Sequence, residues 1–145
     1  MTLKNRILRG VCAMLIICLA LPALCSCGVN EAKSESKAIF EDFFRAIKAE
    51  DYDKAEEYLH PDLPILAVWG QVLIIEERED IDFQSQIVIH RYPSFSSSYY
   101  DSSVDGSKRE LVADATIGDV TVTMEIVIVD NDEGYGIYSF DVYER

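Results

Sequence analysis

The sequence LVADATIGDVTVTMEI, residues 111–126, decides the fold class of this chain. Gly118-Asp119 at its centre is a two-residue loop of the type that joins antiparallel strands. If Ile117 faces Val120, the remaining pairs on the same face are all apolar: Leu111/Ile126, Ala113/Met124 and Ala115/Val122. The opposite face carries polar pairs: Thr116/Thr121 and Asp114/Thr123. Because a slip of one residue would mix the two faces, the pattern predicts this hairpin together with its register.

Further strand-like segments lie on both sides of the hairpin. Residues 86–92 are expected to form a strand, which residues 95–100 continue in a serine-rich, extended form after Pro93. Asp105-Gly106 marks a turn. After a loop at residues 130–134, a last strand is expected from Tyr135 to Tyr143. The C-terminal half is therefore predicted to be an antiparallel sheet of four to five strands.

The residues before the sheet have helical periodicity. An amphipathic helix is expected between Ser36 and Ala49, because the apolar residues there recur every three to four positions. A second helix should begin at Asp51 or Asp53, where Asp53 and Glu56 resemble a capping box, and stop before Pro61. The sequence predicts an α+β fold with two to three N-terminal helices packed on a curved antiparallel sheet.

Residues 65–79 fit either a third helix or a buried strand. We favour a helix, although it has two costs. Val68, Val72, Ile74 and Ile75 are β-branched, and the acidic residues at 76, 77, 79 and 80 would lie at the negative end of the helix dipole. This acidic run is interpreted as a solvated face with Arg78 as its internal counterion.

Composition excludes two classes of protein. The 145 residues carry 13 Lys and Arg against 26 Asp and Glu, a formal charge of −13, whereas a nucleic-acid binder needs clustered basic residues. The chain is 49% apolar, which is too much for a disordered acidic protein. Its length suits one domain.

The first 27 residues have the layout of a secretory signal peptide. Lys4, Arg6 and Arg9 precede an uncharged run at residues 11–25, which is too short for a typical membrane span. Leu24-Cys25-Ser26-Cys27 resembles the lipobox of bacterial lipoproteins. That resemblance implies a diacylglyceryl group on Cys27. Cys25 is a poorer choice, because it would place proline at −3 and leucine at −1.

This assignment predicts three segments: a signal peptide at 1–26, a lipidated cysteine and tether at 27–36, and a domain at 37–145. Cleavage removes three positive and no negative charges, so the formal charge becomes −16. All four cysteines lie in the first 27 residues, so the mature domain has no disulfide. Two acyl chains suffice for stable anchoring, which places the domain on the extracytoplasmic face of the cell membrane.

Two stretches of the domain resemble a known superfamily. Residues 38–62, with their Leu59-His60-Pro61-Asp62 exit, and residues 134–142 are similar to the opening and closing parts of nuclear transport factor 2-like (cystatin-like) domains. The resemblance implies a cone-shaped sheet wrapped on helices, often with a pocket at its open end. Ketosteroid-isomerase and SnoaL-like members use a buried carboxylate with a Tyr or an acid, but no residue here matches that motif.

Aromatic residues are the best candidates for binding. The residues that can line a pocket or a sheet face are Trp69, His90, Tyr92, Phe95, Tyr99, Tyr100 and Tyr138. Core packing is the favoured alternative for Trp69 and Tyr138. His60 is expected at a helix end, where a cation would suit the dipole, and His90 on a sheet face.

No metal or cofactor site is predicted. A zinc site would need His60 and His90 together with carboxylates. Residues 130–134 place glycine at the fifth position rather than the sixth that a calcium loop requires, so they are interpreted as a hairpin loop.

The sequence favours a non-catalytic, lipid-anchored domain. Its partners are the membrane, through the anchor, and a protein, peptide or small ligand bound at the open face of the sheet. The alternatives are a small pocket enzyme of the ketosteroid-isomerase or SnoaL-like type and a module that self-associates through exposed edge strands.

Overall fold

The computed structural model describes residues 28–63 and 68–145. The chain divides into two units, one that ends at Ser34 and one from Glu35 to Arg145, which holds the α+β fold. The predicted signal peptide and Cys27 lie outside the described residues and stay predictions. Within the part of the chain that is described, no helix has the length and apolarity needed to cross a membrane.

The first helix is longer than the sequence predicts. It covers residues 28–48 and so includes the segment expected to be a tether. A helix that has already nucleated extends at little cost through residues such as Ala32 and Lys33, so this part forms without an apolar stripe. The next helix, α2 (Tyr52–Glu56), ends sooner than expected, and Asp51 rather than Asp53 caps it by accepting a hydrogen bond from the Lys54 backbone N–H.

Residues Val68–Glu79 form helix α3, so the helical interpretation of this segment is confirmed. Two of the helices end in the same way, with an acidic residue in the left-handed conformation: Glu50 after the first helix (φ 54°) and Asp80 after α3 (φ 50°). In each case the following N–H returns to a carbonyl five residues earlier, Asp51 to Ala46 at 3.0 Å and Ile81 to Glu76 at 3.2 Å. This is the Schellman ending that glycine usually supplies.

The acidic run at the end of α3 does more than face solvent. The Glu76 carboxylate accepts a hydrogen bond from the Phe83 N–H at 2.9 Å, and the Glu79 carboxylate accepts one from the Glu144 N–H at 2.7 Å. Arg78 donates to the Asp141 carboxylate and to the Val142 carbonyl, both at 2.6 Å. These bonds join the end of α3 to the loop before β1 and to the last strand, so a purely solvated face is wrong for this segment.

The sheet has four antiparallel strands in sequence order: β1 (Ile87–Asp101), β2 (Gly106–Ile117), β3 (Val120–Asn131) and β4 (Gly134–Glu144). The predicted register of the central hairpin is confirmed, with Ile117 opposite Val120 and Leu111 opposite Ile126. The two segments expected before it are one strand, β1, which runs through Pro93.

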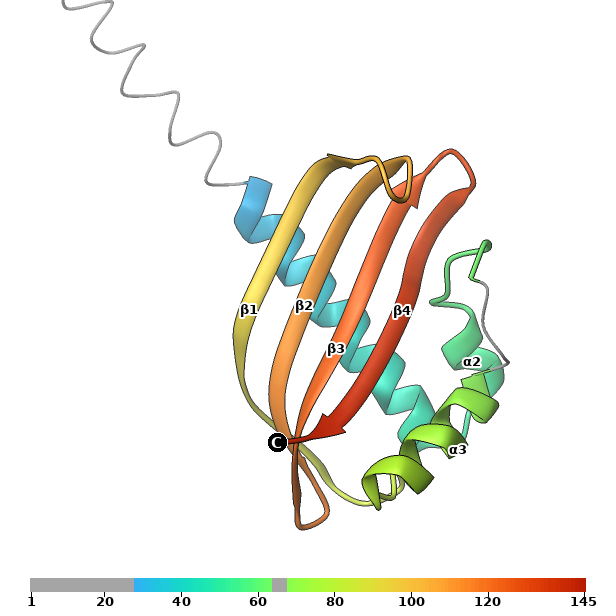
Figure 1. Ribbon diagram of the computed structural model, residues 1–145, viewed down its shortest axis with the longest axis vertical. Helices are drawn as coiled ribbons and strands as arrows, with labels where there is room; N and C mark the ends of the chain where they lie inside the picture. The colour runs from blue at the N-terminus through green and yellow to red at the C-terminus, as the bar shows by residue number, and fades with distance from the viewer. Residues whose placement is uncertain (1–27, 64–67) are drawn as a thin grey trace, which may run out of the picture. The chain divides into compact units, whose positions relative to one another are not determined.

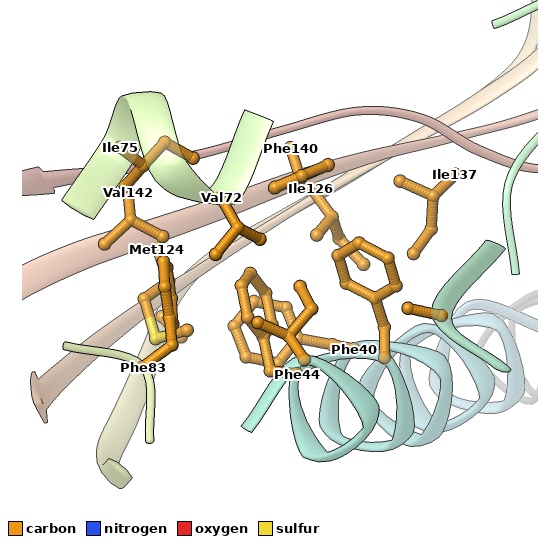
Figure 2. Close-up of a cluster of buried hydrophobic side chains, with 14 of the residues drawn as sticks. Phe40, Phe44, Val72, Ile75, Phe83, Met124, Ile126, Ile137, Phe140 and Val142 are labelled. Carbon is orange, nitrogen blue, oxygen red and sulfur yellow. The ribbon is translucent and has the colours of Figure 1, made fainter. Parts of the chain in front are cut away.

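The core lies between the helices and one face of the sheet. Residues 35–48 of the first helix cross this face diagonally (Figure 1), and their Phe40, Phe43, Phe44 and Ile47 side chains are buried against it. The ring of Phe43 lies 4.9 Å from that of Phe140 on β4, edge to face. Figure 2 shows how side chains from α3, the first helix and the strands fill this space.

The outer edge of β4 is covered by the segment that follows α2. The His60 N–H donates to the Ile137 carbonyl at 2.9 Å, and the Ile137 N–H donates to the Tyr58 carbonyl at 2.7 Å. Gly136 permits this approach, because a Cβ there would lie 2.6 Å from backbone atoms of Leu59 and His60. The two edges of the sheet are therefore different, since β1 has no such cover among the described residues.

Candidate binding surface

Strand β1 is the free edge of the sheet, and it carries five of the seven predicted binding residues: His90, Tyr92, Phe95, Tyr99 and Tyr100. It pairs with β2 alone among the described strands. Its register shifts three times, at 89–91, at 91–94 and at 98–101. His90, Tyr92 and Tyr99 each lie in one of these irregular stretches. Bulges of this kind redirect side chains, which explains why these three residues do not share one face.

The three residues have different surroundings. His90 is exposed, with Nε2 2.6 Å from the Thr116 hydroxyl oxygen on β2. Tyr92 is half-buried on the helix side, where its hydroxyl donates to the Glu41 carboxylate at 2.8 Å and its ring packs edge to face on Phe40. Burial raises the pKa of the Tyr92 hydroxyl, and the bond to Glu41 adds to the effect. Tyr99 is 97% exposed.

A hollow of about 340 Å³ lies between the first helix and the beginning of β1. Ile87 and Ile89 from the strand and Phe44 from the helix supply its apolar lining. The helix adds charged side chains to the lining, those of Glu41, Arg45 and Lys48. The hollow is therefore an apolar groove that opens at the free edge of the sheet and has charged side chains on the side formed by the helix.

The side of this groove formed by the first helix carries more basic than acidic side chains. Lys37 lies one turn before Glu41, with Nζ 4.5 Å from the centre of the Tyr92 ring. Arg45 forms an ion pair with Asp42, and Glu41 receives the Tyr92 hydroxyl. The balance is unusual for this chain, which has twice as many acidic as basic residues.

Two other hollows on the surface are more acidic. One near β4 includes Glu35, Asp42 and Glu57 in its lining. Another, between the strand-connecting loops, includes four carboxylates in its lining: those of Asp62, Asp105, Asp132 and Glu133. The groove beside β1 thus differs from both of these in charge.

Trp69 does not belong to the core, and the expectation of core packing is wrong for it. Its side chain is 54% exposed on α3, beside the exposed Leu73 and Ile74. The buried face of α3 is formed by Val68, Val72 and Ile75 instead. A helix that is apolar nearly all round cannot reveal from sequence which face it buries, so periodicity missed this patch. Contiguous exposed apolar residues are typical of interaction surfaces.

Tyr138 lies at the opposite edge of the sheet from β1, with its ring 5.6 Å from that of His60. It is partly buried and lies outside the hydrophobic core cluster, where it lines the acidic hollow between the loops. The predicted residues therefore do not form one pocket: five are on β1, Trp69 is on α3 and Tyr138 is on β4.

His60 is a structural residue that sequence reasoning placed wrongly. α2 ends at Glu56, so His60 is beyond the helix, and its side chain is only 2% exposed. The Asp62 N–H donates to Nδ1 at 3.1 Å, which leaves the ring hydrogen on Nε2. Nε2 then donates to the Asn131 side-chain oxygen at 3.0 Å or the Gly134 carbonyl at 3.2 Å. The ring joins two loops and does not lie at a helix end.

The loop at residues 130–134 is a hairpin loop, as predicted. Asn131 pairs with Gly134, and the Asn131 side-chain oxygen accepts hydrogen bonds from the Glu133 and Gly134 N–H groups at 3.0 and 3.2 Å. His60 and His90 lie at opposite edges of the sheet. Over residues 28–63 and 68–145, no group of His, Cys, Asp and Glu side chains is arranged to hold a metal ion.

Carboxylates accept hydrogen bonds from tyrosine hydroxyls at four places among the described residues, and none of them has the desolvated base that an isomerase-type mechanism requires. Three of the pairs are Glu41–Tyr92, described above, Asp105–Tyr100 and Glu125–Tyr143. At the fourth, the Glu35 carboxylate accepts from Tyr135 at 3.1 Å and pairs with Arg109 at 2.6 Å. Arg109 lowers the pKa of Glu35, while burial raises that of Tyr135 to about 12. Glu35 is exposed, and Arg109 holds it in the charged form.

The outer face of the sheet carries paired charges. The Asp114 carboxylate on β2 is 2.6 Å from Arg91 Nε and 2.9 Å from Arg145 Nη1. The bond from Arg91 lowers the pKa of Asp114, and the nearby Arg145 lowers it further. Both arginines therefore have a partner in Asp114.

The chain matches no protein family model, no curated protein and no solved structure.

Proposed function

We propose that this protein is a lipid-anchored, extracytoplasmic domain that binds a protein or peptide without catalysis. The free edge of β1, with the groove beside it, is the observation that carries the proposal. Unpaired backbone N–H and C=O groups along an edge strand are a ready template for another chain. Exposed tyrosines at one end of the strand add side chains of the type common in interfaces.

The anchor and the fold family belong to the same proposal. The lipobox-like sequence ending at Cys27 supports attachment to the membrane. Three helices followed by a four-stranded antiparallel sheet are compatible with a nuclear transport factor 2-like domain. The side chains that fill the space between helix and sheet favour a binding surface over an enclosed reaction pocket (Figure 2).

Two experiments test this proposal in intact cells. Cys27→Ala should move the protein out of the membrane fraction, and unchanged membrane retention would contradict the anchor.

For binding, a photoreactive benzoylphenylalanine replaces Tyr99 on β1 or, as a control, the exposed Asp119 in the β2–β3 loop. A crosslinked partner should appear for position 99 and not for 119. Equal crosslinking at both positions, or none at either, would contradict binding at β1.

A further inference from the structure

We propose that β1 accepts an extended, acidic peptide as an additional strand, with the apolar side chains of the peptide in the groove beside Phe44. This deepens the proposed function, on which it rests, by naming the mode of binding and the chemistry of the partner. Strand addition takes its affinity from main-chain hydrogen bonds and its specificity from pockets for alternate side chains. Both features are present at this edge.

The backbone of β1 limits what can pair with it. Ser94 to Ser98 pair with β2 without interruption, and irregular stretches lie on either side of this window. Pro93 lacks an N–H, and bulges twist an edge away from a partner, so both protect against sheet-to-sheet aggregation. A short flexible peptide can follow such an edge more easily than a strand held in a second sheet. The formal charge of −13 per chain also opposes pairing of two copies.

The side chains beside the edge select for apolar residues. Ile87, Ile89, Tyr92 and Phe95 are partly buried residues of β1 that pack against the core. An added strand would continue the face that they form, and every second side chain would point to the groove. At about 3.3 Å per residue, a peptide of about ten residues reaches from the groove to Ser98.

The charges around the groove favour acidic residues in the bound peptide. From Ile87 to Tyr100, β1 contains no Asp or Glu, although the chain contains 26. On the side of the groove formed by the first helix, Lys37, Arg45 and Lys48 lie next to this part of β1. The Glu41 carboxylate there accepts a hydrogen bond from the Tyr92 hydroxyl. The acidic hollows elsewhere on the domain would repel the same peptide. The groove thus complements a carboxylate-bearing partner better than either of these two hollows does.

The test uses the full chain in detergent and three fluorescein-labelled nonapeptides measured by fluorescence anisotropy. The first alternates valine with threonine and carries two aspartates, the second carries lysines in place of the aspartates, and the third is the acidic peptide with N-methylated backbone. At about 0.15 M salt, exposed charges more than about 8 Å apart are largely screened, so contacts near the groove dominate. The acidic peptide should bind about tenfold more tightly than either of the others.

Charge reversal provides a matched comparison. Arg45→Glu combined with Lys48→Glu should remove the preference for the acidic peptide. Lys54→Glu, an exposed lysine of α2 outside the groove lining, should leave it unchanged. Equal binding of the acidic and lysine peptides to the unaltered protein would overturn the proposal, as would an unchanged preference in the double variant.

Proline substitution tests the main-chain hydrogen bonds. Successive N–H groups in a strand point to opposite sides, so one of Ser96 and Ser97 donates toward β2 and the other toward the open edge. Of Ser96→Pro and Ser97→Pro, the variant that keeps the melting temperature has lost the outward N–H, and it should bind the acidic peptide about tenfold more weakly. Unchanged binding by this variant would overturn strand addition.

The same proline variant separates this inference from the proposed function. If it still crosslinks a partner through position 99 in cells, the domain binds a protein but not by strand addition. If neither crosslinking nor peptide binding is seen with the unaltered edge, both proposals fail. A stable dimer in sedimentation that this proline variant dissociates would replace the peptide with a second copy of the chain.

Discussion

Replacing Gly136 with alanine should disrupt the cover on the β4 edge. A Cβ at this position would lie 2.6 Å from the carbonyl carbon of Leu59 and 2.6 Å from the backbone nitrogen of His60. Backbone atoms cannot rotate away from such a clash as the end of a flexible side chain can. The φ of +157° adds a cost of about 1–3 kcal/mol for a residue that has a side chain.

The size of the effect follows from the bonds that would be lost. The clash is relieved only if residues 58–60 move away, which breaks the two backbone hydrogen bonds that join Tyr58 and His60 to Ile137. Each contributes about 0.5–1.5 kcal/mol. Together with the conformational cost, Gly136→Ala should lower the free energy of unfolding by about 2–6 kcal/mol. Domains of this kind have about 5–15 kcal/mol in total, so the loss would be large.

Urea unfolding followed by far-UV circular dichroism measures this loss, with Gly118→Ala as the matched control. Gly118 also has a positive φ, +58°, but the nearest atoms to a Cβ there are side-chain atoms of Ser85 at 3.6 Å. It should therefore lose only the conformational part, about 1–2 kcal/mol. Equal losses in the two variants would refute the reasoning, because they would mean that the contact with residues 58–60 contributes nothing to stability.

Three further variants test other parts of the structure. His60→Phe should lower the free energy of unfolding by about 2–3 kcal/mol, because it leaves the buried partners of the ring without hydrogen bonds; a loss below that of a surface substitution would contradict the role of His60. Asp80→Gly should raise the free energy of unfolding by about 1 kcal/mol, because glycine adopts the left-handed conformation more readily; a lower urea midpoint would count against this. Asp114→Asn should destabilise the domain at neutral pH and lose its effect as the pH falls below the range in which an aspartate ordinarily titrates. The folded-state pKa of Asp114 is depressed, so its contribution is present above the unfolded-state pKa and disappears as the pH falls through the folded-state value; a constant difference in urea midpoint across this range would exclude the ion pair as its cause.

The sheet was more predictable from the sequence than the helices, for a physical reason. Side chains in a strand alternate between its two faces. Once Gly118-Asp119 fixes the turn, the polarity of the side chains therefore determines the register from Ile117/Val120 to Leu111/Ile126. Helix ends have no comparable constraint. The helix ends predicted at Ala49 and Glu79 lie within one residue of the observed ends, but the left-handed conformation of Glu50 and Asp80, which glycine usually supplies, was not predictable from these acidic residues.

The candidate surface was predictable only as a set of residue types. Aromatic residues on the serine-rich strand indicated β1, and His90, Tyr92 and Tyr99 are there. The sequence could not show that the register shifts turn them to different sides, because a bulge depends on pairing with β2. Trp69, which was expected in the core, is exposed, and His60, which was expected at a helix end, is buried beyond the helix. Exposure and burial at those two positions are set by which face of α3 meets the sheet and by where α2 ends.

The two edges of the sheet show where the fold is closed and where it is left open. At β4, two glycines and a buried histidine allow residues 58–61 to approach the strand: Gly134 lies against Pro61, Gly136 against Leu59, and His60 bonds to the loop between β3 and β4. These residues are specific to one contact, and a side chain at either glycine would prevent it. At β1, protection comes only from Pro93 and bulges, which shorten the edge without covering it. A fold that needed both edges closed for solubility would have a cover at both. The uncovered edge, with its basic groove in an acidic chain, is therefore the place where a second polypeptide can add to this structure with the least rearrangement.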